Sequence, residues 1–154
     1  MKKIILLSLT ALCASCGKTP TNGHLDGQWF MTERYCKANI SAPEYSEAMG
    51  NLREQPVIWN ISLQLLEIIT PGFMHNSVTD RTTGRIVYND DKLAVTQTYV
   101  HFRDRDSLIT EPNTTCLESV GIRGNSATFR IATLTSSQLT LCSDMDSLIF
   151  RKKH

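Results

Sequence analysis

Short runs in which apolar and polar residues alternate dominate the chain downstream of residue 25. In residues 57–65 the apolar positions fall two apart, with Asn60, Ser62 and Gln64 between them. This period of two favours a β-strand with one buried face over a helix. The apolar positions of this predicted strand are Val57, Trp59, Ile61, Leu63 and Leu65.

A hairpin is predicted further along the chain. Residues 85–88 and 93–103 both have strand character, and they flank Asn89-Asp90-Asp91-Lys92. Asn and Asp favour turns because their side chains hydrogen-bond to nearby backbone and tolerate left-handed conformations. We therefore expect the two strands to pair antiparallel across this turn.

Three more strands are expected near the C-terminus. Residues 127–134, 139–142 and 148–151 each place apolar side chains at alternate positions. The intervening turn formers are Gly124-Asn125, Thr135-Ser136-Ser137 and Ser143-Asp144. Many short strands at this spacing predict an all-β fold, either an antiparallel sandwich or a barrel.

Two short segments have helical signals instead. Residues 41–50 and 115–121 each begin with Ser or Thr followed three residues later by Glu, and each ends in Gly. This is the spacing of a capping box with a glycine stop. Each predicted helix is only about two turns long.

The amino terminus has the order of an export signal. Lys2 and Lys3 precede an apolar run over residues 4–12, and small residues then lead to Cys16. The apolar run is too short to span a bilayer as a helix, which takes about 20 residues. We therefore expect residues 1–15 to be a signal peptide that is removed on export.

The residues before the expected cleavage site also fit a more specific pattern. Leu12-Cys13-Ala14-Ser15-Cys16 resembles the lipobox of bacterial lipoproteins, in which the cysteine is acylated, with palmitate among the acyl chains. The resemblance implies that Cys16 becomes the lipid-bearing first residue of the mature chain. The alternative is an ordinary secretory signal cleaved near Ser15, with Cys16 a free or bridged thiol.

The residues after the signal predict a tether and one domain. Residues 16–25 are rich in turn formers and lack apolar periodicity, so we interpret them as a flexible tether. At about 3.5 Å per residue, this tether holds the domain less than about 30 Å from the membrane. The remaining residues, 26–154, suit a single domain with one core.

Charge and cysteine content narrow the classes of function. The formal net charge is only +1, which is no electrostatic footprint for nucleic acid. Export would place Cys36, Cys116 and Cys142 in an oxidising compartment, where two of them are expected to form one disulfide. The sequence does not choose among the alternative pairings.

The chain carries no recognisable catalytic or metal-binding motif. Its four histidines, His24, His75, His101 and His154, lack the spacing of zinc sites. None of its serines lies in a Gly-x-Ser-x-Gly setting. We therefore expect no metal, no cofactor and no enzymatic activity.

The start of the first predicted strand carries a family resemblance. Leu25-Asp26-Gly27-Gln28-Trp29 is similar to the Gly-x-Trp opening of lipocalins and other calycin barrels. Together with Cys16, the strand over residues 57–65 and the strands near the C-terminus, it resembles the small lipocalin-like lipoproteins of Bacteroidetes-type bacteria. The resemblance implies a single antiparallel up-and-down β-barrel with one or two short helices.

The same resemblance implies a structural role for the first tryptophan. Trp29 would close one end of the barrel, and a basic residue of the last strand, Arg151 or Lys152, would pack over its indole ring. A cation over an indole face contributes about 0.5 to 2 kcal/mol.

Two functions remain open for such a barrel. If the barrel holds a cavity, a small apolar ligand would bind among the inward-facing strand residues. If side chains fill the interior, the protein would instead be a solid-core accessory or inhibitor-like subunit that binds a protein partner through its loops. The residues predicted to face inward are Trp59, Ile61, Leu63, Tyr99, Phe129, Ile131 and Leu141.

Further sequence features concern the cell envelope. Asp106-Ser107-Leu108 and Asp146-Ser147-Leu148 resemble O-glycosylation sites of exported Bacteroidetes proteins, which makes Ser107 and Ser147 candidate modified residues. Residues 17–20 carry no acidic run of the kind that often accompanies surface export in such lipoproteins. We therefore expect the lipid to hold the protein on the outer membrane, facing the periplasm.

Overall fold

The structure is a computed structural model that describes residues 20–37, 47–48, 57–70, 78–102, 106–110 and 117–153. Within these ranges the chain forms ten β-strands and two short 3-10 helices, η1 (Gly23–Leu25) and η2 (Glu118–Val120). The first five strands are β1 (Gly27–Cys36), β2 (Glu47–Ala48), β3 (Ile58–Ser62), β4 (Leu65–Ile69) and β5 (Val78–Asn89). The others are β6 (Lys92–Phe102), β7 (Asp106–Leu108), β8 (Ala127–Leu134), β9 (Gln138–Cys142) and β10 (Asp146–Lys152).

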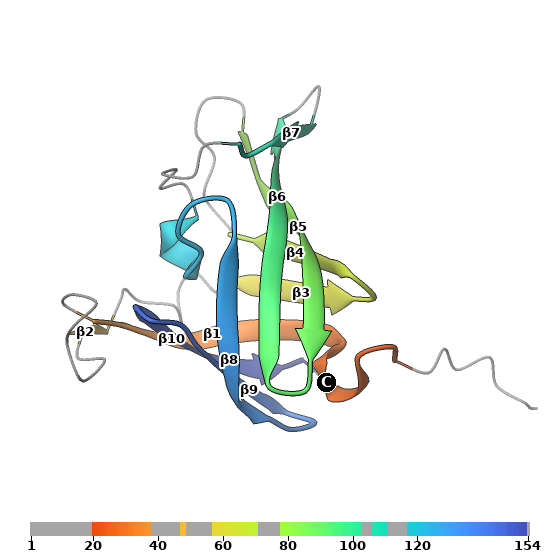
Figure 1. Ribbon diagram of the computed structural model, residues 1–154, viewed down its shortest axis with the longest axis vertical. Coiled ribbons are helices and arrows are strands. Elements are labelled where there is room, and N and C mark those ends of the chain that lie inside the picture. The colour runs from red at the N-terminus through yellow and green to blue at the C-terminus, as the bar shows by residue number, and fades with distance from the viewer. Residues whose placement is uncertain are drawn as a thin grey trace, which may run out of the picture.

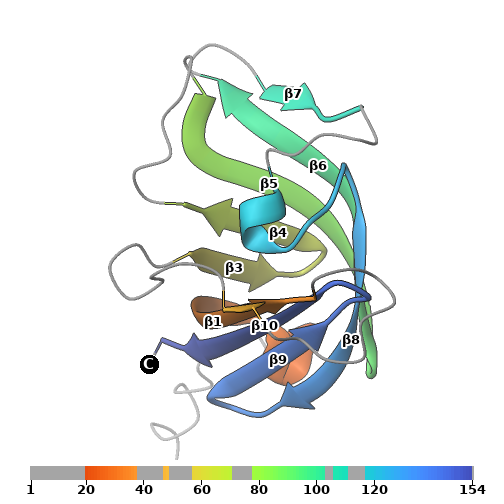
Figure 2. The same ribbon diagram turned by 90° about the vertical axis from the view of Figure 1, so that its left-hand side faces the viewer.

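Eight of these strands form a closed antiparallel barrel (Figures 1 and 2). They follow one another round the barrel in chain order, and β10 pairs with β1 to close the ring. The strands β2 and β7 are short additions beside β1 and β6. The predicted all-β, up-and-down barrel is therefore confirmed. Closure leaves the barrel strands without an open edge that could pair with another chain.

The period of two in the sequence becomes the inside and the outside of the barrel. In β10, for example, Asp146, Leu148 and Phe150 are buried, whereas Ser147 and Ile149 between them are only partly covered. The predicted hairpin is present as β5 and β6, joined by a turn at Asp90-Asp91. The strands predicted near the C-terminus are present as β8, β9 and β10.

The predicted end of the strand over residues 57–65 is wrong. It stops at Ser62, a turn occupies Leu63 and Gln64, and β4 begins at Leu65. Leu63 adopts a left-handed backbone with a φ of 56°. The turn reverses the pattern of burial, because Ile61 and Leu66 lie in the core while Leu63 and Leu65 are exposed. The alternation in the sequence runs through the turn and hides it.

Neither predicted helix is present at its expected length in the described residues. In residues 41–50 the described part is strand β2, which pairs with Tyr35 and Cys36; the rest lies outside the described residues. In the described part of residues 115–121 only the single turn of η2 forms, and Leu117 at its N-cap makes no side-chain capping hydrogen bond. Gly121 does end this turn in the left-handed conformation. A Cβ atom there would lie 2.8 Å from Leu148, so the turn packs directly on the core.

The predicted tether ends earlier than residue 25. Leu25 is fully buried in the core, and η1 folds against the barrel. Asn22 is also held, because its side chain donates a 2.6 Å hydrogen bond to the Asp26 carboxylate. The folded part therefore includes residues before the predicted boundary at 26. The signal peptide and Cys16 lie outside the described residues, and no helix within the described ranges is long and apolar enough to cross a membrane.

A disulfide between Cys36 and Cys142 is not formed. Both are free thiols, and β10 lies between their strands, with Cys36 opposite Asp146 and Cys142 opposite Ser147. Two strand spacings amount to about 10 Å, whereas bridged cysteines have Cα atoms within about 7 Å. The two pairings that involve Cys116 lie outside the described residues.

Candidate functional site

One end of the barrel is sealed around Trp29. The side chain is fully buried, and its Nε1–H donates a 2.7 Å hydrogen bond to the backbone oxygen of Leu25 in η1. Lys152 lies directly opposite Trp29 in the β1–β10 pair, with Nζ 4.9 Å from the centre of the ring. Arg151 instead lies opposite Phe30 and is exposed. Of the two basic residues considered, Lys152 is thus the one that covers the indole.

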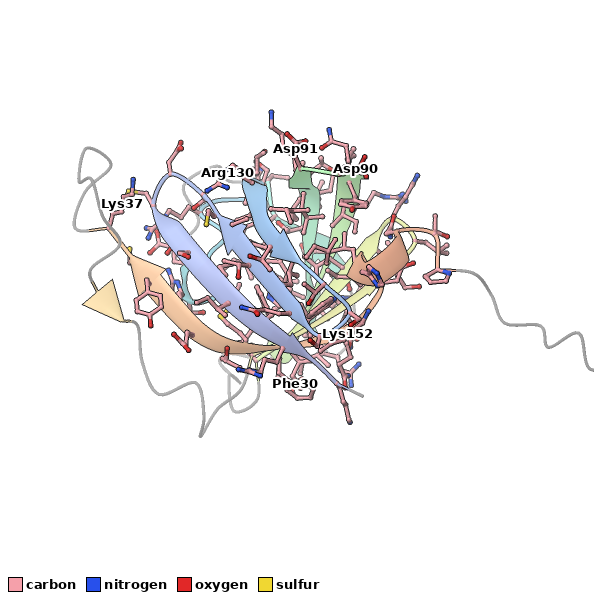
Figure 3. All side chains as sticks on the ribbon, turned by 90° about the horizontal axis from the view of Figure 1, so that it is seen from below. Phe30, Lys37, Asp90, Asp91, Arg130 and Lys152 are labelled. Atoms are coloured by element: carbon pink, nitrogen blue, oxygen red, sulfur yellow. The ribbon has the colours of Figure 1, made fainter. Side chains whose placement is uncertain are left out.

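The glycine of the Gly-x-Trp sequence makes room for this lysine. Gly27 has a φ of 132°, and a Cβ atom on it would lie 2.5 Å from Cε of Lys152. The Lys152 ammonium also donates a 2.7 Å hydrogen bond to the backbone oxygen of His24. Burial lowers the pKa of Lys152, an effect that the nearby Asp26 carboxylate opposes. Figure 3 shows Lys152 far from Lys37, which follows β1 at its other end.

Aromatic rings surround the second tryptophan on the inner face of the barrel. Trp59 lies on β3 directly opposite Trp29 on β1, and it is also fully buried. Its ring centre lies 5.0 Å from that of Phe150 on β10 and 6.0 Å from that of Phe129 on β8. Tilted and edge-on aromatic pairs at these distances are favourable. Side chains from three strands thus meet in the interior.

The indole N–H of Trp59 differs from the other buried side-chain polar atoms of the described residues because it has no hydrogen-bond partner. It is a buried donor, and no acceptor for it lies among the described residues. Buried polar groups in proteins nearly always have a partner, and leaving one without a partner costs about 1 to 3 kcal/mol. Among the buried side-chain nitrogen and oxygen atoms of the described residues, this donor is the one that a bound molecule could supply with a hydrogen bond.

Charged groups lie toward the other end of β1 and are paired with each other. Arg34 and Asp146 form a buried ion pair at 2.7 Å. Arg123 donates to the other Asp146 oxygen at 3.0 Å and to Sγ of Cys36 at 3.3 Å, and it lies 3.9 Å from Glu118. Burial opposes the charge of Arg123, but the hydrogen bond and the charge of Asp146 outweigh it, so its pKa is raised.

The structure places the seven predicted lining residues in three different settings. Four are buried in the core: Trp59, Ile61, Phe129 and Leu141. Ile131 is partly buried and packs against that core. The other two predictions are wrong, since Leu63 is exposed on the β3–β4 turn and Tyr99 is on the outer face.

Tyr99 faces outward because the strand changes phase. The β5–β6 register shifts by one residue between Arg85 and Ile86, which places an extra residue in β6. Leu93 and Val95 are buried before this bulge, and Thr98 is buried after it. Tyr99 follows Thr98 directly and so points to the opposite face.

The sequence did not predict two other features of the interior, the Phe150 ring and the Arg34–Asp146 pair. Phe150 was recognised only as part of the last strand, although its spacing from Leu148 was a signal that both face inward. The Arg34–Asp146 pair joins residues 112 apart in sequence, and no local signal points to it.

A hydroxyl, an imidazole and a carboxylate line up on the outer face, which the sequence did not suggest. Thr83 Oγ1 lies 2.5 Å from Nε2 of His101, and Nδ1 of His101 lies 2.6 Å from Asp106. Thr83 has a strand on each side, so the backbone N–H groups near it belong to the β-ladders and are not aimed at a developing oxyanion. Asp106 is also largely exposed. This arrangement ties β5, β6 and β7 together.

The remaining candidate positions lie on the outside of the barrel. Ser107 is exposed on β7, whereas Ser147 is partly buried on β10, 3.8 Å from Sγ of Cys142. Across the described ranges, no group of three or more His, Cys, Asp or Glu side chains could hold a metal ion.

Comparisons with known proteins agree with this geometry. The family model of the lipocalin-like domain matches residues 10–153. Among solved structures, the chain resembles a lipocalin-like protein from Bacteroides uniformis, with 17% identity, a TM-score of 0.51, and coverage of 85% of this chain and 100% of the other. It also resembles an uncharacterized protein from Bacteroides eggerthii, with 15% identity, a TM-score of 0.50, and coverage of 83% and 98%. No curated protein matches it significantly. The chain therefore belongs to the family of lipocalin-like domains.

Proposed function

We propose that this protein is a lipid-anchored component of the cell envelope whose barrel binds a small, mainly apolar molecule with a neutral hydrogen-bond acceptor. Cys16 would carry the lipid, on the outer membrane and facing the periplasm. The protein would act by binding its ligand, without catalysis. The lipocalin-like fold supports a ligand-binding role.

The observation that carries this proposal is the buried N–H of Trp59. The aromatic rings of Phe129 and Phe150 beside it provide apolar contacts, and the donor has no partner within the described part of the chain. Ligand pockets typically combine an apolar lining with a few polar groups that fix orientation. A ligand carbonyl or hydroxyl oxygen at Nε1 would supply the missing acceptor.

The acceptor is expected to be neutral because Arg34, the one buried cation among the described residues, is already paired. Arg34 and Arg123 both contact Asp146, and Arg123 lies beside Glu118 as well. A carboxylate brought next to Trp59 would be a buried charge without a counter-ion, which is strongly unfavourable. The ligand class is therefore an apolar ketone, ester, amide or alcohol, and a free fatty acid would fit poorly.

A second candidate function rests on how closely the rings meet. Trp59 contacts rings from both β8 and β10, and η2 adds Val120 to the same core. If these side chains fill the interior, the barrel is a solid scaffold that binds a protein partner through its loops. In that case the Trp59 N–H would have no role in binding.

Chain-matched compounds distinguish the two candidates. Methyl nonyl ketone and undecane have the same number of carbon atoms, and only the ketone has an acceptor. Calorimetric titration of a chain without residues 1–16 should show the ketone binding about tenfold more tightly, the value of one hydrogen bond. Trp59→Phe should remove this preference, and Trp29→Phe should keep it. Failure of both compounds to bind would favour the solid scaffold.

The anchoring part of the proposal has its own test. Cells that express the full chain would be fed labelled palmitate, and the membrane fraction would be compared with that of a Cys16→Ser variant. The wild-type chain should carry label and sediment with membranes, whereas the variant should carry none. Equal labelling, or no labelling of either chain, would exclude acylation of Cys16.

A further inference from the structure

Three exposed aliphatic side chains gather where β3 turns into β4. Leu63 is 59% exposed, Leu65 47% and Val87 61%. Leu65 lies opposite Arg85, which makes Val87 its diagonal neighbour on β5. A hydrogen bond of 2.9 Å from the Ile86 N–H to the Gln64 oxygen holds the turn against β5. We call the surface formed by Leu63, Leu65 and Val87 the turn face.

The backbone at this turn is unfavourable for the residue that occupies it. Leu63 has a φ of 56°, a conformation in which the Cβ atom of a leucine crowds the backbone. Asparagine or glycine is the usual residue there. The fold gives this leucine little packing in return, because more than half of the residue is exposed to solvent. A contact outside the barrel would explain both the choice of residue and its exposure.

The chain from the expected lipid site enters the domain at this turn. The Asn22 side chain donates a 2.6 Å hydrogen bond to the backbone oxygen of Leu63. Pro20 lies two residues before Asn22, and its oxygen accepts a hydrogen bond from Gly23. Cys16 lies four Cα-to-Cα steps before Pro20, and these steps can span at most about 14 Å. A lipid on Cys16 would therefore hold the turn face close to the membrane surface.

We propose that the turn face rests in the headgroup layer of the membrane that holds the lipid anchor. The inference depends on the acylation of Cys16 in the proposed function. Aliphatic side chains of this kind gain free energy on entering the boundary between headgroups and acyl chains. The domain would then stand with η1 and the β3–β4 turn toward the bilayer, and the Arg34–Asp146 pair away from it.

The charges nearby indicate that the contact is apolar rather than electrostatic. Arg85 lies beside Leu65, but the neighbouring β5–β6 turn carries exposed Asp90 and Asp91 (Figure 3). With both signs present, no strong attraction to anionic lipids is expected. Binding of the turn face should therefore be nearly the same on vesicles with and without phosphatidylglycerol, and nearly independent of salt.

The test uses two tryptophan variants of the full, acylated chain. Leu63→Trp places a reporter on the turn face, and Leu108→Trp places one on β7, where the native leucine is similarly exposed at 43%. Trp29 and Trp59 are buried and contribute the same background to both. Each chain is reconstituted into phosphatidylethanolamine vesicles with and without brominated lipid, which quenches tryptophan at the membrane. Leu63→Trp should lose most of its added fluorescence, and Leu108→Trp should lose none.

The other outcomes each have a distinct meaning. If both chains float with vesicles and neither reporter is quenched, the anchor is present and the membrane contact is absent, which overturns this inference alone. If neither chain floats and neither is labelled at Cys16, the anchoring proposal fails and this inference fails with it. If the Leu63→Trp emission is shielded only when sedimentation shows a dimer, the turn face binds a second copy instead, and the membrane contact is again overturned.

Discussion

The two tryptophans lie directly opposite each other in the sheet, yet only one of them has a hydrogen-bond partner for its indole N–H within the described residues. Trp29 and Trp59 are directly paired between β1 and β3, and both are fully buried. The N–H of Trp29 has an acceptor at 2.7 Å, and Lys152 covers its ring. The N–H of Trp59 has no acceptor in the described part of the chain, although aromatic rings surround it.

This difference indicates that Trp29 closes the barrel, whereas Trp59 is the residue that we propose binds a ligand. The indole N–H of Trp29 and the ammonium of Lys152 both have acceptors within the fold, so closure of that end needs no ligand. Burying the Trp59 donor without a partner lowers the stability of the ligand-free protein, and in our proposal a ligand acceptor would offset this cost. The left-handed Leu63 is similar, since its backbone is strained and more than half of the residue is exposed. We propose that partners outside the folded chain account for both.

The largest expected effect shows what an unpaired buried group costs in this barrel. Asp146→Ala removes the carboxylate that pairs with Arg34, and it should lower the free energy of unfolding by about 3 to 5 kcal/mol. Urea denaturation measures this change. Adding Arg34→Met to the variant should restore much of the loss, because no buried unpaired charge then remains, and the exposed Arg123 keeps Glu118 nearby. A loss below about 1 kcal/mol would show that this interior tolerates orphaned polar groups.

The next effect compares the two tryptophans directly. Trp29→Phe and Trp59→Phe remove the same atoms, but only the first leaves a backbone acceptor, the Leu25 oxygen, without its donor. In ligand-free protein, Trp29→Phe should therefore be more destabilising by about 1 to 3 kcal/mol. Denaturation of the two variants side by side provides the measurement. Equal losses would remove the distinction on which the site rests.

The strain at Leu63 predicts a gain of stability. Leu63→Asn suits the left-handed backbone, and it should stabilise the protein in solution by about 1 kcal/mol. Thermal unfolding without vesicles checks this, and Leu65→Asn, at a strand position with no such strain, serves as the control. A destabilised Leu63→Asn would mean that the leucine supports the fold itself.

A smaller effect is expected at the closed end. Lys152→Met keeps the aliphatic stem but removes the ammonium over Trp29 and its hydrogen bond to His24. The loss should be about 0.5 to 2 kcal/mol, reduced because burial of the ammonium is itself unfavourable. Thermal unfolding measures it, and Lys153→Met, which removes an exposed ammonium 6.0 Å from the centre of the Phe30 ring, gives the matched control. Equal stability of the two variants would contradict a role in closure.

The smallest effect depends on pH and lies on the outer face. A hydrogen bond from Asn60 lowers the pKa of Glu67 below its ordinary 4.5, and Arg81 adds to the shift. Because the folded pKa is lower than the unfolded one, this group contributes stability above pH 4.5, which is lost as the pH falls through the folded pKa. Asn60→Ala should weaken the acid dependence of Tm, measured from neutral pH to below 4.5. An unchanged acid dependence would contradict the assignment.

Much of the fold followed from the sequence because its signals are local. The period of two and the Asn-Asp turn chemistry placed the β5–β6 hairpin, and the Gly-x-Trp opening indicated the barrel. The turn at Leu63 could not be predicted, because leucine carries no turn signal and the apolar alternation continues through it. The bulge in β6 likewise reversed Tyr99 without any change in the local pattern.

The site was less predictable because it depends on partners far apart in the chain. The sequence identified Trp59 as an inward residue, but it did not distinguish its N–H from that of Trp29. That distinction arises because η1 places the Leu25 oxygen within reach of one indole and not the other. The pairing of Arg34 with Asp146, which makes the interior electrically neutral, spans almost the whole barrel domain.

The central claim is that a ligand acceptor completes the hydrogen bonding of Trp59. The chain has two tryptophans, so a proton–nitrogen correlation spectrum of ¹⁵N-labelled protein shows two indole N–H signals, which Trp29→Phe and Trp59→Phe assign. On addition of methyl nonyl ketone, the Trp59 signal should move downfield, while the Trp29 signal stays in place. If the ketone leaves the Trp59 signal where undecane leaves it, or moves only that of Trp29, the claim is contradicted.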